Sequence, residues 1–545
     1  MALTDRKSWQ ALRSHAVATG NQHLSELLED RDRFDHFSLQ QGDLLLDYSK
    51  QRITRETTEL LCGLARECDL NDWIGKLFSG AAINTSENRP ALHTALRLPE
   101  NSVLSLNGTN IVHGIHETLH RMEQIVERIH AGQWRGFSGM PVDTVVNIGV
   151  GGSDLGPFMA AKALGDTHAV YEGQLEMYFV STMDGSQLAE RLDTLNPATT
   201  LFILSSKSFT TIDTLSNANT ALQWLRHASG AEDEVLYRRH FIGVSAASDK
   251  MAAWGIPPNS RLQLWDWIGG RYSMWSAIGL PIALEIGMEN FRRMLAGAHA
   301  MDLHFRNERF ERNLPVMLAL IGIWNINFLN IRAHAILPYD GRLSHLPAYL
   351  EQLEMESNGK SVSRDGEPIT YNTCPILWGE IGPNAQHAFY QLLHQGTESV
   401  MCDFVVTARR YHESGNPELQ EQHKLTLANC LAQSRILALG DTVVEDSANT
   451  SVFKRYRGNQ PSTTLLLDEL TPYSFGQLIA LYEHKVFVQS VIWNINPFDQ
   501  WGVELGKQMA TTLIAPLEQS EASLDFDPST NGLLGAILRQ QDEKS

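Results

Sequence analysis

The chain has 545 residues and a formal net charge of −19, from 44 lysines and arginines against 63 aspartates and glutamates. A chain of this length can bury large cores and is expected to form more than one domain. The negative charge disfavours nucleic acid as a partner, because proteins bind the phosphate backbone mainly through lysine and arginine. An anionic substrate would therefore need a local basic cluster that acts against the overall field.

The cysteine pattern and the apolar runs indicate where the protein works. The five cysteines are scattered and form no C-x-x-C pair, which is typical of a reducing compartment and argues against a disulfide framework or a structural zinc site. The first residues lack the apolar core of a signal peptide. The longest apolar run, residues 314–324, is too short to span a bilayer. We therefore expect a cytoplasmic protein that has no membrane partner.

Residues 1–122 are predicted to be a mainly helical segment that packs on the second of the two domains described next. Residues 24–29 and 57–65 carry apolar side chains at i, i+3 and i+4 spacing, which indicates helices with one buried face. Residues 89–97 combine basic side chains with His93. A buried structural histidine is the favoured interpretation of His93 when it is taken alone.

From residue 123 onward, short apolar runs alternate with helical patterns. The first series predicts strands at 144–150, 175–180, 199–204 and 241–244. The second series predicts helical stretches at 288–332 and 348–355, and strands at 333–338, 374–378, 401–407 and 463–467. Repeated strand–turn–helix units predict an α/β fold with two doubly wound parallel sheets. We place the first domain at 123–286, the second at 287–513 and an acidic C-terminal arm at 514–545.

A hydroxyl-rich turn, residues 205–214 with the sequence SSKSFTTIDT, lies between a predicted strand and a predicted helix. This order puts hydroxyls and free backbone N–H groups at a helix N-terminus, which favours a phosphate site. Lys207 adds a positive charge. The alternative is a simple helix cap, but the turn has more hydroxyls than a cap needs: Ser205, Ser206, Ser208, Thr210 and Thr211.

A glycine-rich loop, residues 149–156 with the sequence GVGGSDLG, follows the first predicted strand. Ligands of doubly wound sheets bind at the carboxyl ends of strands, where this loop would lie. The dinucleotide pattern G-x-G-x-x-G fails because Asp154 occupies the third glycine position, and the P-loop pattern fails because Pro157 stands where lysine is required. Neither a nicotinamide cofactor nor a nucleotide is supported.

Four further residues are candidates for catalysis or ligand binding. Arg271 follows two glycines, which allow close approach to a ligand, although a structural pair with Asp266 remains an alternative. Glu356 adjoins a Ser-Asn-Gly turn, but a solvated glutamate is the favoured interpretation when it is taken alone. His387 is expected in the first turn of a helix, where the imidazolium is disfavoured and acid–base work is favoured. Lys507 would need an anionic partner if it faces inward.

Six motifs resemble those of the phosphoglucose isomerase (glucose-6-phosphate isomerase) family and occur in the family's order. They are GVGGSDLGP from Gly149, SSKSFTT from Ser205, GGRYS from Gly269, QLEMESNGK from Gln352, AQHAFYQL around His387 and FDQWGVELGK from Phe498. The resemblance spans nearly the whole chain. It implies two sugar isomerase (SIS) domains and a homodimer whose active sites draw on both subunits. The implied glycolytic and gluconeogenic reaction interconverts glucose 6-phosphate and fructose 6-phosphate without cofactor or metal.

The resemblance also implies a role for each candidate residue. Glu356 resembles the base that carries the proton between C2 and C1, Arg271 the group that stabilises the enediolate, and His387 with Lys507 the pair that opens the ring. The other positions resemble substrate-binding residues: Ser206, Lys207, Ser208 and Thr211 around the phosphate, and Gly152, Ser153, Gln352 and Gln500 along the sugar. Asp213 stands where many members have glutamate, which shortens the carboxylate by about 1.5 Å and leaves its contact to the histidine or sugar open.

Two alternatives to this enzyme remain at the level of sequence. A non-catalytic sugar-phosphate sensor on the same fold would keep the hydroxyl-rich turn but would not need Glu356, His387 and Lys507 together, and all three are present. A broader aldose–ketose isomerase that also accepts mannose 6-phosphate is not distinguished by the sequence.

Overall fold

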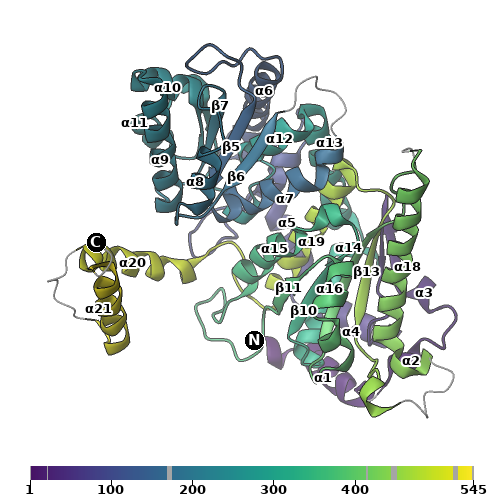
Figure 1. Ribbon diagram of the computed structural model, residues 1–545. Helices are drawn as coiled ribbons and strands as arrows, with labels where there is room; N and C mark the ends of the chain where they lie inside the picture. The colour runs from purple at the N-terminus through teal and green to yellow at the C-terminus, as the bar shows by residue number, and fades with distance from the viewer. Residues whose placement is uncertain are drawn as a thin grey trace. The chain divides into compact units, whose positions relative to one another are not determined.

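The structure is a computed structural model that describes residues 2–20, 22–167, 175–412, 415–443, 451–518 and 526–542 (Figure 1). It divides into two units, Met1–Pro497 and Phe498–Ser545, and each is described by itself. Among the helices in these ranges, none has both the length and the apolar character needed to cross a bilayer.

The first sheet of the larger unit has five parallel strands in the order β6-β5-β7-β8-β9 (Figure 1). Their bounds are β5 (Thr144–Gly149), β6 (Glu176–Val180), β7 (Thr200–Ser205), β8 (Phe241–Ser245) and β9 (Arg261–Gln263). The first four confirm predicted strands to within one residue at each end. The short strand β9 has no predicted counterpart.

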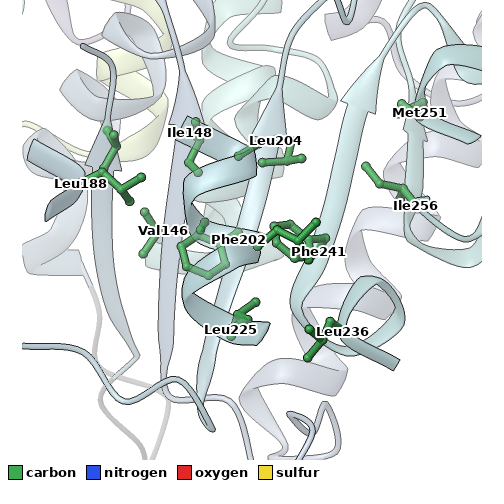
Figure 2. Packing of buried hydrophobic residues seen from close by; sticks show 14 of the residues in the cluster. Val146, Ile148, Leu188, Phe202, Leu204, Leu225, Leu236, Phe241, Met251 and Ile256 are labelled. Atoms are coloured by element: carbon green, nitrogen blue, oxygen red, sulfur yellow. The ribbon is translucent and has the colours of Figure 1, made fainter. Parts of the chain in front are cut away.

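One face of this sheet is covered by α8 (Ser186–Leu192), α9 (Ile212–Ser229), α10 (Asp233–His240) and α11 (Ser248–Trp254). Residues two apart in a strand point to the same face, and this face presents large apolar side chains from β5 and β7 to the helices, as Figure 2 shows. These side chains are fully buried: Val146, Ile148, Phe202 and Leu204. The buried core fixes where each strand ends, and therefore where the loops after β5 and β7 begin.

The second sheet has the order β1-β2-β13-β12-β10-β11. The strands β10 (Ala333–Pro338), β11 (Ile376–Gly379), β12 (Val400–Thr407) and β13 (Ser462–Leu467) are parallel and confirm the four predicted strands. The hairpin of β1 (Ser38–Gln41) and β2 (Leu44–Asp47) pairs with β13 in the antiparallel sense. This hairpin was missed in a segment predicted to be mainly helical. Its signal is the Gly42-Asp43 turn, in which Gly42 has a φ of 56°.

The larger unit contains fifteen further α-helices in the described ranges. They are α1 (Lys7–Thr19), α2 (Leu24–Leu27), α3 (Arg33–His36), α4 (Arg55–Glu67), α5 (Leu70–Ser79), α6 (Ile111–His130), α7 (Leu155–Leu164), α12 (Leu280–Ile286), α13 (Met288–Asn307), α14 (Leu314–Ile323), α15 (Leu346–Glu351), α16 (Gly382–Ala388), α17 (Tyr390–Gln395), α18 (Pro417–Leu439) and α19 (Pro472–Ile492). A two-stranded ribbon joins β3 (Ser105–Leu106) to β4 (Thr109–Asn110). The smaller unit holds α20 (Glu504–Glu518) and α21 (Pro528–Asp542).

The two sheets share one strand order. In the first, β5 lies between β6 and β7, and in the second, β10 lies between β11 and β12. This is the doubly wound order, in which successive strands are added on one side of the first strand and then on the other, so that the strand order reverses between the first and third strands of the series. Ligands bind at such topological switch points, outside the carboxyl ends of the strands. The fold therefore offers two candidate sites, one beside β5 and β7 and one beside β10 and β12.

The second switch point is occupied by a carboxylate of the protein itself. Asp340, which follows β10 and is 2% exposed, accepts hydrogen bonds from Arg342 Nη2 at 2.7 Å, Arg410 Nη1 at 3.1 Å and the Thr407 hydroxyl at 3.2 Å. Burial by itself raises the pKa of Asp340, but the bonds and charges of Arg342 and Arg410 outweigh it and hold the pKa below its usual value. This leaves the first switch point as the candidate site for an anionic ligand.

We expect the Asp340→Asn protein to be less stable by about 3 kcal/mol, because its arginine partners lose a buried counter-charge. Because the folded-state pKa is depressed, this stabilisation is present above the unfolded pKa of about 3.9 and is lost as the pH falls through the folded value. Thermal unfolding at pH 7 measures the change. The matched control is Asp468→Asn, which breaks a more exposed pair with Arg409 and should cost less than about 1 kcal/mol. Equal losses in both variants would contradict a special role for Asp340.

Candidate active site

The glycine-rich loop after β5 lies directly against the segment that carries Arg271. Residues Gly151–Ser153 form a 3-10 turn, η3, and Gly270–Tyr272 form another, η6. A Cβ added to Gly152 would lie 2.1 Å from the Gly270 carbonyl oxygen. Because no side chain fits in that space, glycine at position 152 is what lets the two turns meet.

Arg271 and Glu356 form the central pair of the site. The Arg271 side chain is 1% exposed, and its Nη1 donates to Glu356 Oε1 at 3.0 Å. Gln352 Nε2 donates to the other carboxylate oxygen at 2.8 Å. The Glu356 side chain is 25% exposed, so a ligand can reach the carboxylate. The sequence left open a pair between Arg271 and Asp266; in the structure the guanidinium pairs with Glu356.

Buried contacts of the neighbouring residues hold the backbone around Glu356 in place. Residues Gln352–Glu356 form η11, a π-helical segment that follows α15, and such segments are frequent at functional sites. Within it, Glu354 accepts from Lys485 Nζ of α19 at 2.6 Å, and both side chains are almost fully buried. Arg271 Nε donates to the Ser357 hydroxyl at 2.6 Å. The carboxylate and the guanidinium are therefore fixed by the fold before any ligand binds.

His93 supports the same region from the N-terminal segment. It is 2% exposed and stacks on Tyr272 with ring centroids 4.6 Å apart. The Tyr272 hydroxyl lies 3.0 Å from the Ser357 hydroxyl. Burial holds the pKa of His93 well below its usual value, so the ring is neutral. The prediction of a buried structural histidine is confirmed.

Residues 205–211 of the hydroxyl-rich turn connect β7 to α9. They are called the phosphate loop below, after the phosphate site that the sequence predicts there. Phe209 adopts a left-handed φ of 49° and is buried, which anchors the loop on the core. The Ser206 and Thr211 hydroxyls are 3.1 Å apart, and those of Ser208 and Thr210 are 2.8 Å apart. Thr211 is the N-cap residue of α9 but makes no side-chain capping bond, so the capping alternative does not account for its hydroxyl.

The structure also shows where three other candidate residues at or near this loop lie. Ser205 and Ser206 are both buried. The Ser205 hydroxyl donates to Asn147 Oδ1 at 2.9 Å, so it is directed to β5 and not to the turn. Lys207 Nζ donates to the carbonyl oxygens of Asp266 at 2.9 Å and Ile268 at 2.7 Å. Asp213 is half-buried in the first turn of α9.

The position predicted for His387 is wrong. Helix α16 begins at Gly382, so His387 is near its C-terminal end, and it is exposed. The prediction that a helix N-terminus favours its neutral form therefore has no basis. The helix ends at Ala388, and Phe389 separates it from α17. His394 lies in α17, where its Nε2 is 2.9 Å from Gln433 Oε1. Pro383 at the start of the helix was the signal for the correct boundary.

Lys507 and Gln500 belong to the smaller unit. The Lys507 side chain is 63% exposed and pairs with Glu504 at 3.1 Å on α20. Gln500 precedes the turn η15 (Trp501–Val503) and is exposed. Across the described residues of both units, no group of three histidine, cysteine, aspartate or glutamate side chains is placed to hold a metal ion.

Comparison with known proteins decides the family. The family model for phosphoglucose isomerase matches residues 47–534. The chain belongs to the phosphoglucose isomerase family. It is 58% identical to glucose-6-phosphate isomerase 2 of Chromohalobacter salexigens over 547 residues, or 98% of each chain. It is 57% identical to glucose-6-phosphate isomerase of Psychrobacter cryohalolentis over 97% of this chain and 96% of that one.

The fold is that of a phosphoglucose isomerase as well. The crystal structure of a glucose-6-phosphate isomerase from Chlamydia trachomatis superposes with a TM-score of 0.85 at 32% identity, and all of each chain is covered. The α/β class with two parallel sheets is thereby confirmed.

Sequence reasoning missed several residues that hold the candidate site together. Ser357 bonds Arg271, Lys485 pairs with Glu354, and the Pro497 carbonyl accepts from Arg271 Nη2. Ser357 lies within the motif QLEMESNGK and Pro497 directly precedes FDQWGVELGK, but neither residue type indicated a contact with Arg271. Lys485 is a lysine in the middle of a buried apolar helix. Glu483 is buried in the same helix. Charged side chains in such a run require partners, and that was the available signal.

Proposed function

We propose that Glu356 is the base that moves a proton between C2 and C1 of the open-chain sugar, with Arg271 as the cation that stabilises the negative charge formed. As a member of the phosphoglucose isomerase family, the chain interconverts glucose 6-phosphate and fructose 6-phosphate (EC 5.3.1.9), so its substrate is a hexose phosphate. The observation that carries the assignment is the 3.0 Å pair between a reachable carboxylate and a buried guanidinium.

The reaction needs both members of this pair. A proton alpha to a carbonyl is weakly acidic, so its removal requires a positioned base and a group that stabilises the developing oxyanion. Glu356 takes the C2 proton of the aldose, and the C–H electrons form the C1–C2 double bond while the carbonyl electrons move to O1. The resulting cis-enediolate becomes the ketose when Glu356 returns the proton to C1, the C2–O bond becomes the carbonyl, and the proton of the C2 hydroxyl is transferred to O1. Gln352 holds the second carboxylate oxygen during these steps.

The phosphate loop is proposed to bind the substrate phosphate at the first switch point. The hydroxyls of Ser206, Ser208 and Thr211 and the uncapped first turn of α9 supply donors. Strand pairing places Gly149 opposite Ser205, so the loops after β5 and β7 are neighbours. The sugar is proposed to lie along Gly152, Ser153 and Gln352, with Asp213 near the phosphate end. The family resemblance makes Gln500 a further proposed sugar-binding residue. Binding energy from the phosphate positions the reacting carbons.

We expect the Ser208→Ala/Thr211→Ala double variant to raise KM for fructose 6-phosphate about 10- to 100-fold, since each hydrogen bond to a charged group contributes about 1.5–3 kcal/mol and water replaces part of it. Inorganic phosphate should inhibit the wild-type enzyme competitively and the double variant much less. Thr220→Ala is the matched control, because Thr220 is exposed on α9 and bonds only within the helix. Unchanged kinetics in the double variant would place the phosphate elsewhere.

We further propose a homodimer in which His387 and Lys507 form the ring-opening pair and each site draws on both subunits. His387 is exposed on the larger unit. The helices of the smaller unit carry exposed apolar side chains, which favours a covering partner: Trp501, Leu505, Ile514 and Leu533. A cytoplasmic location is proposed as well, supported by five unpaired cysteines.

A further inference from the structure

We propose that Lys207 is a positioning residue that holds Arg271 in place and does not itself bind the substrate phosphate. The inference rests on the proposed function, since it assumes that Arg271 acts on the reacting carbons. The resemblance alone would place Lys207 in the phosphate cradle. The structure instead directs its ammonium group to the backbone that leads to Arg271, through carbonyl oxygens of Asp266 and Ile268 at 2.9 and 2.7 Å.

Hydrogen bonds hold both the backbone and the ammonium group of Lys207. Its own carbonyl oxygen accepts from the Ser245 hydroxyl at 2.9 Å and from the Ala246 N–H at 3.0 Å, which attaches its backbone to the end of β8. An ammonium group has three donors, and two of them are used on carbonyl oxygens. Burial lowers the pKa of this ammonium to about 8, as expected for a side chain withdrawn from water. The residue therefore links β8 and the phosphate loop to residues 266–268.

Those residues control Arg271 because the chain between them is short and tightly held. Ile268 is three positions before Arg271, and the Trp267 carbonyl accepts from the Leu92 N–H at 3.1 Å. The Gly270 carbonyl lies against Gly152. A shift of this segment would move the guanidinium relative to Glu356 and open the contact with the glycine-rich loop. A displacement of about 1 Å at a reacting group can cost 10²-fold in rate.

The test is Lys207→Met, which keeps the length and apolar stem of the side chain and removes the ammonium. We expect kcat to fall about 10- to 100-fold, while KM and the inhibition constant of inorganic phosphate stay within about twofold. Lys207→Arg, which keeps a charged donor, should recover most of kcat. Lys250→Met is the matched control, since Lys250 is exposed and donates to the Ser208 carbonyl of the same loop at 3.3 Å; its kcat should stay within about twofold of wild type.

The link to Arg271 is tested in an Arg271→Lys background, where adding Lys207→Met should lower kcat by less than about threefold more. A phosphate inhibition constant that rises together with KM at unchanged kcat would overturn the inference, as would additive losses in the double variant or no change at all. If circular dichroism shows that Lys207→Met does not fold, Lys207→Gln is measured in the same way and decides by the same outcomes. An active Glu356→Gln enzyme would instead contradict the proposed function, whatever Lys207 does.

Discussion

Replacing Glu356 by glutamine is expected to lower kcat for isomerisation by about 10²- to 10⁴-fold, because an amide cannot accept the C2 proton. The amide can still accept a hydrogen bond from Arg271, whose Nη1 lies 3.0 Å from Glu356 Oε1. KM should therefore change little. A coupled assay that starts from fructose 6-phosphate and detects glucose 6-phosphate measures both constants.

Glu351→Gln is the matched control for this experiment. Glu351 is a half-buried glutamate at the end of α15, one residue before the segment that carries Glu356. The same substitution there changes charge without touching the Arg271 pair, so kcat should remain within about threefold of wild type. A Glu356→Gln enzyme that keeps more than about a tenth of wild-type kcat would exclude Glu356 as the base.

Replacing His387 by alanine is expected to give the second large effect. If this histidine acts only in ring opening, turnover of cyclic fructose 6-phosphate should fall by about 10²-fold or more. An open-chain analogue that needs no opening should still be converted at a nearly normal rate. The Glu356→Gln enzyme should fail on both substrates. Equal losses on both substrates in the His387→Ala enzyme would show that His387 takes part in proton transfer or in holding the site.

Mixing the two inactive variants tests whether the sites are shared between subunits. If His387 serves the partner subunit's site, heterodimers of His387→Ala and Glu356→Gln each contain one intact site and one that lacks both residues. Random mixing makes about half of the dimers mixed, so activity should return to about a quarter of the wild-type value. If mass measurements confirm subunit exchange and no activity returns, each site takes both residues from one chain.

The strands could be predicted from the sequence because burial dictates their composition. β7 is a run of apolar and β-branched residues that must lie inside a sheet, and all six of its residues are buried. The hairpin of β1 and β2 could not be placed this way, since four-residue strands carry too little pattern, and pairing with β13 decides their structure. The position of His387 in its helix was predicted wrongly because the helical sequence pattern continues across the break at Phe389 between α16 and α17.

The candidate site was likewise predictable from the sequence only in part. Turn chemistry identified the glycine-rich loop and the hydroxyls of the phosphate loop, because close backbone approach and anion binding restrict the residue types. The pairing of Arg271 with Glu356 joins residues 85 positions apart, and no local pattern encodes such a contact. The direction of the Lys207 side chain was likewise set by carbonyl oxygens 59 and 61 positions away. From the sequence alone, the positive charge of Lys207 suggested only that it binds the phosphate.

Transfer of hydrogen from solvent tests the central claim most directly. Isomerisation is run in deuterium oxide, and deuterium at C1 of fructose 6-phosphate and at C2 of glucose 6-phosphate is followed by NMR. The wild-type enzyme should introduce deuterium at both carbons, because the proton held by Glu356 exchanges with solvent at the enediolate stage. The Glu356→Gln enzyme should introduce none above background over the same number of hours. Deuterium incorporation at the wild-type rate in that variant would contradict the account.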